Sequence, residues 1–189
     1  MNMTSSIRSL TKGKLATGVR QARCVALTAT GKRCCRRTRC SDKCTQHLEL
    51  LDGLRIAPSL LAGAGLGLFT TVARSKGQRI VQYAGKHVQL DPSKAESEAY
   101  GGVYVLEMSQ SHFIDASSPV SGAGRYSNTA RAWNVARGEC RGNNAHFTLD
   151  RRGRGTAWIT ATKALQAGDE VLTAYGRQYR IPYPPSASD

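Results

Sequence analysis

The sequence predicts a mostly β protein built from several short sheets with little helix. Its apolar residues fall into short runs, and glycine or polar residues break each run. Short apolar runs between such breaks are typical of strands, whereas helices need a longer apolar period. From this pattern alone we expect a small β barrel or sandwich. The 189 residues are enough for one hydrophobic core and a small appendage.

The expected strands follow one another along the chain. They are residues 54–57, 80–85, 102–108, 112–116, 144–150, 156–162 and 170–173. The third and fourth of them are separated by a short polar turn, so we expect them to form a hairpin. The polar residues 86–101, which include Pro92, give no clear indication of their form.

The N-terminus is strongly basic. Residues 1–23 carry Lys and Arg but no acid and have no helical apolar stripe, so we expect a disordered basic arm there. A mitochondrial transit peptide would have the same composition. The chain has a formal net charge of +14, and residues 1–50 hold 11 Lys and Arg against only Asp42 and Glu49. This charge suits nucleic acid as a partner, and it equally suits a solvated tail.

The sequence gives no indication of a membrane or secreted protein. No apolar run approaches the length of a membrane span, and no signal-type apolar segment follows the first Met. We therefore expect an intracellular protein that does not insert into membranes. Disulfide bonds fit such a protein poorly, because intracellular thiols stay reduced.

Cysteines cluster directly after the basic arm. Five of the six lie within 21 residues, and the cluster ends in a Cys-x-x-His pair. Thiolates and an imidazole in a tetrahedral set suit zinc, whose binding can fold a segment too short to bury a core. We expect a zinc knuckle over residues 24–50, with the ligands Cys24, Cys34, Cys44 and His47.

The zinc prediction leaves alternatives open. Spacing alone does not decide whether the second ligand is Cys34, Cys35 or Cys40, and a loose cysteine-rich tail or a disulfide pair would give the same composition. The segment resembles the small zinc motif Cys-x-Ala-x-Thr-x-x-Gly-x-x-Cys…Cys-x-x-His, which is found beside various domains. The remaining Cys140 is expected to be an ordinary buried or loop thiol.

Two segments are dense in small and polar residues where a packed segment would be apolar, which is typical of a site. They are residues 122–130, GAGRYSNTA, and residues 174–176, AYG, which follow the turn 168–170. The first resembles the Arg-aromatic-x-Asn-His-Ser signature of SET-domain protein lysine methyltransferases, and the second resembles the Tyr-Gly signature of that family. The resemblance covers residues 54–180 and leaves 181–189 as a C-terminal tail. It implies a SET-like fold whose C-terminal segment threads under a loop near the first signature, forming a pseudoknot.

The resemblance also implies S-adenosylmethionine as the cofactor. Residues 65–67 match the family's Gly-x-Gly loop, where glycine lets the backbone approach a ligand. Asn128 matches the residue that contacts the amino end of the cofactor, and Arg125 matches the arginine that braces the knot. The candidate cofactor-binding residues are Gly65, Leu66, Gly67, Arg125, Tyr126, Asn128, Thr129 and Tyr175.

Three aromatic residues carry the catalytic part of the resemblance. Tyr175 matches the catalytic tyrosine whose hydroxyl lies beside the transferring methyl group, and Tyr83 and Phe147 match aromatic residues of the lysine channel. A free lysine has a pKa of about 10.4, so roughly one molecule in a few thousand is neutral at pH 7. An aromatic channel beside a cationic sulfonium favours the neutral amine. Taken singly, each of these aromatic residues could be an ordinary core residue of a β sheet.

The implied function is methylation of lysine in histone or another basic, chromatin-associated protein, with a nuclear location. Thr129 and Ala130 depart from the family, which has His followed by Ser or Cys at these positions. A SET-like binding module without turnover is therefore one alternative. A nucleic-acid-binding protein that uses the zinc knuckle and the basic arm is another.

Overall fold

The computed structural model of the chain describes residues 21–61, 63–91, 93, 102–130, 142–150 and 155–175. Several predicted features therefore lie wholly or largely outside the described residues: the arm 1–23, most of the segment 86–101 after Asp91, Cys140, Gly176 and the tail 181–189. Within the described part of the chain, no helix combines the length and the hydropathy needed to cross a membrane.

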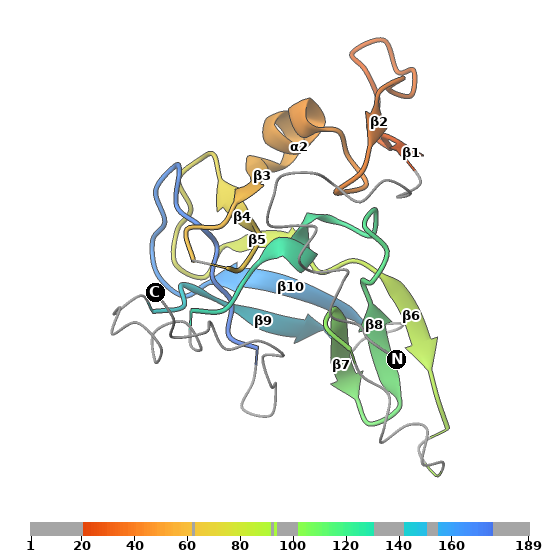
Figure 1. Cartoon of the computed structure of the whole chain (residues 1–189), viewed down its shortest axis with the longest axis vertical. Coiled ribbons are helices and arrows are strands. Elements are labelled where there is room, and N and C mark those ends of the chain that lie inside the picture. The colour runs from red at the N-terminus through yellow and green to blue at the C-terminus, as the bar shows by residue number, and fades with distance from the viewer. Residues whose placement is uncertain are drawn as a thin grey trace.

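Short antiparallel strands form four small sheets among the described residues (Figure 1). The two-stranded sheets join β1 (Ala22–Arg23) with β2 (Arg37–Thr38), and β3 (Leu54–Pro58) with β4 (Leu66–Thr70). One three-stranded sheet has the order β5 (Arg79–Gln82), β10 (Thr156–Ala161), β9 (Ala145–Asp150). The other has the order β6 (Lys86–Gln89), β8 (His112–Asp115), β7 (Val105–Ser109). The described helices are α2 (Thr45–Asp52) and the 3-10 helix η2 (Ala123–Tyr126).

The hydrophobic core lies where these sheets meet. In β10, the central strand of its sheet, Ala157, Ile159 and Ala161 alternate along the strand and are almost fully buried. Leu68 from β4 and Ile114 from β8 belong to the same buried cluster. Since burying one such aliphatic side chain contributes roughly 1.5–3 kcal/mol, this cluster holds sheets from distant parts of the sequence together.

The predicted fold class, mostly β with several short sheets, is confirmed. The expected strands between residues 54 and 162 are present, and residues 105–109 and 112–115 form the expected hairpin. The segment 170–173 differs from its prediction because it is not a strand of any sheet. Its residues instead form isolated bridges with three different partners, Phe69, Asn128 and Ala145, so no ladder can propagate along it.

The helix α2 was not expected from the sequence. It has eight residues, only Leu48 of them is buried, and it ends at Gly53, whose left-handed φ of 62° lets its N–H donate to the Glu49 carbonyl. One buried position in two turns gives a weak apolar stripe, which explains why the pattern did not reveal it. In Figure 1, α2 lies with β1 and β2 at one end of the molecule. It joins the cysteine cluster directly to β3.

Candidate active site and metal site

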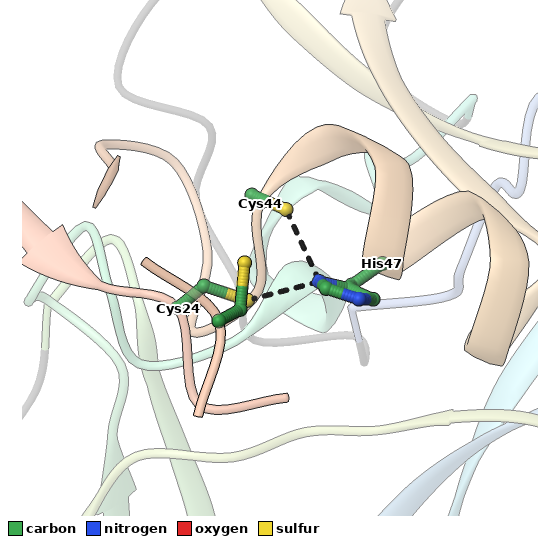
Figure 2. Close-up of side chains that lie close together, drawn as sticks. Cys24, Cys44 and His47 are labelled. Atoms are coloured by element: carbon green, nitrogen blue, oxygen red, sulfur yellow. Dashed lines mark hydrogen bonds between the residues drawn. The ribbon is translucent and has the colours of Figure 1, made fainter. Parts of the chain in front are cut away.

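Four side chains converge in the cysteine-rich segment. The Sγ atoms of Cys24, Cys34 and Cys44 and a ring nitrogen of His47 all lie within 4.8 Å of one another. Figure 2 shows His47 Nδ1 directed at two of the thiols, 3.5 Å from Cys24 Sγ and 3.4 Å from Cys44 Sγ. Three thiols and one imidazole make a tetrahedral donor set that suits zinc. The group could therefore hold a zinc ion.

Local structure explains how this group forms. Cys44 directly precedes α2 and His47 lies in its first turn, so the two side chains face the same side. Gly31, with a left-handed φ of 74°, turns the chain back between Cys24 and Cys34. The structure places Cys34 in the group and leaves Cys35 exposed, and Cys40 also lies outside the group. Spacing alone had left the choice among these three open.

The Cys24 thiol already has the character of a ligand. Burial raises its pKa, but the backbone amides of Cys44 and Ala26 and the side chain of His47 outweigh that effect and lower the pKa to about 7. Hydrogen bonds to the thiolate favour the charged form, which is the form that binds metal. The backbone N–H of Arg36 also donates to Cys34 Sγ at 3.4 Å and lowers the pKa of that thiol, but burial and the neighbouring Cys24 and Cys44 raise the pKa overall.

The two signature segments meet as predicted. Thr173 N donates to the Asn128 carbonyl at 2.7 Å, and the Leu172 carbonyl accepts from Asn144 N at 2.9 Å and Ala145 N at 3.0 Å. Residues 171–174 therefore run between the first signature and the start of β9. Residues 131–141, which connect those two neighbours and would complete the pseudoknot, lie outside the described residues.

The hydroxyl of Tyr175 is fixed by the first signature. It donates to the Ser127 carbonyl at 2.6 Å. Ser127 Oγ donates in turn to the Val171 carbonyl at 2.9 Å and contacts Thr173 Oγ1. Since Ser127 and Thr173 are buried, the tyrosine is held by a rigid part of the crossing.

The three predicted catalytic residues line one small cavity of about 50 Å³. The rings of Tyr83 and Phe147 meet edge to face with centroids 5.3 Å apart, a favourable geometry for aromatic pairs. Tyr83 donates its hydroxyl hydrogen to the Tyr104 carbonyl at 3.0 Å, and Tyr104 and Tyr175 also line the cavity. The cavity is narrow and aromatic, as the predicted lysine channel would be.

Arg125 forms another part of this wall. Its guanidinium stacks on the Tyr104 ring at 3.7 Å from the centroid, and its Nη1 donates to the Ser117 carbonyl at 2.9 Å. Its Nε is buried without a hydrogen-bond partner. The side chain thus connects the signature to the segment after β8.

Asn128 is oriented by two acceptors. Its Nδ2 donates to the Leu66 carbonyl at 3.0 Å and lies 3.4 Å from Oε1 of the buried Glu170. The same carboxylate accepts from Ser59 Oγ at 2.6 Å and from Leu60 N at 2.9 Å. Glu170 therefore ties together the loop before β4, the first signature and the C-terminal segment.

The two glycines of the predicted cofactor loop have different surroundings. Gly65 has a left-handed φ of 75°, and a side chain there would point into open space. A Cβ at Gly67 would instead collide with the Glu170 carboxylate and would lie 3.2 Å from Ser59 Cα. Gly65 leaves room for a ligand beside the backbone, whereas Gly67 makes room for Glu170.

Asn143 compensates in part for the unusual Thr129 and Ala130. Its Oδ1 accepts from Ala130 N at 2.8 Å and lies 3.5 Å from Thr129 Oγ1. Ala130 is fully buried and belongs to a small cluster with Leu61 and Leu172. The backbone of this segment is therefore held in place although both side chains depart from the signature.

Tyr126 points toward the metal-binding segment. Its hydroxyl contacts the Cys40 thiol, and burial together with the neighbouring Cys40 raises the pKa of Tyr126. Burial raises the pKa of the Cys40 thiol, and the hydrogen bond with Tyr126 and the charges of Arg125 and Arg39 offset this rise only in part. Cys40 thus lies at the junction between the knuckle and the first signature.

The sequence analysis assigned no site role to Tyr104, Ser127 or Glu170, and it considered Cys40 only as a possible metal ligand. Only Glu170 carried a signal, because an acid directly before the apolar Val171 and Leu172 is unusual unless it is paired. The other three depend on contacts that local sequence does not encode.

Comparison with known families identifies the fold. The sequence model of the SET domain matches residues 65–176, which is more than half of the chain. The chain therefore belongs to the SET-domain family, as the two signatures predicted.

Individual relatives are more distant. N-lysine methyltransferase KMT5A-A of Danio rerio is 26% identical over 145 residues, and the match covers 69% of this chain and 39% of that protein. The chain thus corresponds to well under half of that relative. A crystal structure of an active polycomb repressive complex 2 in the basal state matches 66% of this chain and 15% of its own, with 20% identity and a TM-score of 0.49. The crystal structure of the Chaetomium thermophilum polycomb repressive complex 2 matches 70% of this chain and 16% of its own chain, with 19% identity and a TM-score of 0.49.

Proposed function

We propose that this protein is an S-adenosylmethionine-dependent protein-lysine N-methyltransferase. The observation that carries the proposal is the convergence of Tyr83, Phe147 and Tyr175 on one aromatic cavity beside the SET signature segment. The similarity to an N-lysine methyltransferase supports the same reaction class. The acceptor we propose is histone or another basic, chromatin-associated protein, which implies a nuclear location.

The residues of the signature fit the proposed cofactor. The amide nitrogen of Asn128 donates to the Leu66 carbonyl and to the Glu170 carboxylate. Its Oδ1 accepts no hydrogen bond from the described residues. That oxygen is suited to accept from an ammonium group, while the open space at Gly65 leaves room for a ligand along the backbone. S-adenosylmethionine would supply the methyl group, so the protein itself needs no nucleophile.

The chain's own residues would orient the amine and favour its neutral form. The aromatic walls from Tyr83, Tyr104 and Phe147 exclude water, and a desolvated ammonium loses its proton more readily. Tyr175 cannot serve as a mobile acid because its hydroxyl hydrogen is held by the Ser127 carbonyl. Tyr175 lines the aromatic cavity with its hydroxyl held in one orientation, which assigns it an aligning role.

The test is methyl transfer from labelled S-adenosylmethionine to core histones by the full chain and two variants. Tyr175→Phe keeps the ring but removes the hydroxyl, so turnover should fall by about 100-fold or more while cofactor affinity changes little. Asn128→Ala should weaken cofactor binding first, because it removes a proposed ligand. If both variants bind cofactor and transfer methyl groups like the parent, the proposed site is wrong.

A second candidate function is nucleic-acid binding through the N-terminus. In the described part of this region, Arg36, Arg37 and Arg39 are consecutive or nearly so, and all three are exposed. Exposed arginines of this kind suit contacts with phosphates. Such binding could accompany methyl transfer on chromatin, or it could be the main activity if Thr129 and Ala130 have abolished turnover.

A further inference from the structure

A cavity of about 310 Å³ separates the knuckle from the SET domain. Residues 37–41, 43–45 and Leu48 of the knuckle line it, together with Ile56 of β3 and Leu66 of β4. Cavities that hold small molecules start at about this size, roughly 300 Å³. The aromatic channel is several times smaller, with about 50 Å³.

This cavity adjoins two of the segments expected to bind cofactor. Leu66 lines it, and the Leu66 carbonyl is the acceptor that orients Asn128 at 3.0 Å. Cys40 lines it from the knuckle side, and the Cys40 thiol contacts the Tyr126 hydroxyl. The Gly-x-Gly loop therefore reaches the cavity through Leu66, and the first signature contacts one of the lining residues, Cys40, through Tyr126.

The charge on the cavity wall is positive. Arg37, Arg39 and Lys43 line it, and none of the described residues that line it is acidic. Lys43 is paired with Asp52 at 2.8 Å, whereas Arg37 and Arg39 are exposed. A ligand that carries a carboxylate suits such a wall, because guanidinium groups bind carboxylates with two parallel hydrogen bonds.

The same wall is part of the metal group. Cys44 lines the cavity and also belongs to the four converging side chains, and α2 begins at the next residue. The other members of the group fix the course of residues 34–44 on both sides of Cys40. A segment this short has little core of its own, so a metal bound by this group would help to hold its shape.

On the basis of the proposed function, we propose that the Cys/His knuckle forms one wall of the S-adenosylmethionine site and that its arginines face the carboxylate end of the cofactor. Metal retention and cofactor binding are then coupled. Coupling between two ligands is reciprocal, so each ligand should strengthen the binding of the other.

The first test fills the cavity without touching a metal ligand. Thr45 lines the cavity at the start of α2, and the neighbouring Gln46 is equally exposed but does not line it. Binding of S-adenosylhomocysteine, measured by calorimetry, should weaken by about tenfold or more in Thr45→Trp and by less than about twofold in Gln46→Trp. Both variants should retain the parent's zinc content and circular dichroism spectrum, which shows that the loss is local.

The second test measures the coupling itself. Saturating S-adenosylhomocysteine should slow the release of zinc from the full chain to a chromogenic chelator, and removal of zinc should weaken S-adenosylhomocysteine binding. Cys35→Ser is the control, since its exposed thiol lies outside the metal group and the change should leave both quantities unaltered.

The outcomes separate this inference from the proposed function. If the parent chain binds no S-adenosylhomocysteine, the proposed function fails and the inference fails with it. If the parent binds it but Thr45→Trp binds equally well, only the inference is overturned. The same holds if zinc release is independent of S-adenosylhomocysteine.

Discussion

Replacement of Glu170 by alanine should destabilise the fold strongly. The side chain is 5% exposed, and its oxygens accept from Ser59 Oγ at 2.6 Å and Leu60 N at 2.9 Å. A buried donor that loses its acceptor lowers the free energy of unfolding by about 1–3 kcal/mol. The loss lies in the upper part of this range when the lost acceptor is charged. Two such donors and the space left beside Gly67 give an expected loss of about 3–5 kcal/mol in the free energy of unfolding.

Urea unfolding of the parent and three variants measures this loss. Glu170→Gln should cost less than Glu170→Ala, about 1–2 kcal/mol, because the amide oxygen can still accept from Leu60 N and the Ser59 hydroxyl can turn to accept. Asp169→Asn is the matched control, because the adjacent carboxylate is exposed and, among the described residues, accepts from Gln166 N alone, in a turn. It should change the free energy of unfolding by less than about 0.5 kcal/mol. If the free energy of unfolding of Glu170→Ala is within about 1 kcal/mol of the parent value, Glu170 does not hold the loop before β4, the first signature and the C-terminal segment together.

Two further predictions concern the N-terminal part of the chain. Purified protein should contain about one equivalent of zinc, and His47→Ala should lower that content because three ligands rarely hold a structural ion, whereas Cys35→Ser should not. A metal-free parent with an intact knuckle would contradict this. Deletion of residues 1–20, which leaves β1 in place, removes basic residues and no acid, so the affinity for duplex DNA should fall and its dependence on salt should flatten. An unchanged salt dependence, measured by titration at several ionic strengths, would show that the arm is only solvated.

The parts that sequence predicted well are those with a local pattern. The strand at 156–162 could be predicted because Ala157, Ile159 and Ala161 alternate with less buried residues along β10. The metal group could be predicted because Cys44 and His47 are three residues apart. This spacing brings two ligands to one side of a helical turn, so the site could be predicted although the helix α2 was not.

The parts that sequence could not predict depend on contacts between distant residues. Ser59 and Glu170 are separated by 111 positions, and nothing near either residue specifies the other. The failure at 170–173 has the same origin. A run of apolar residues indicates a strand only when one neighbour can pair along its whole length, and this segment meets several neighbours for one or two residues each.

Arg125 connects the structural and the chemical parts of the site. Its guanidinium is permanently charged, stacks on Tyr104 at 3.7 Å and lines the aromatic cavity with Tyr83 and Tyr175. In the proposed reaction the incoming lysine must be neutral, and a fixed cation in the wall disfavours the ammonium form. The same charge is tolerated in this wall because the Tyr104 ring and the Ser117 carbonyl compensate it. In this proposal Arg125 would therefore both hold the signature segment and help to deprotonate the substrate.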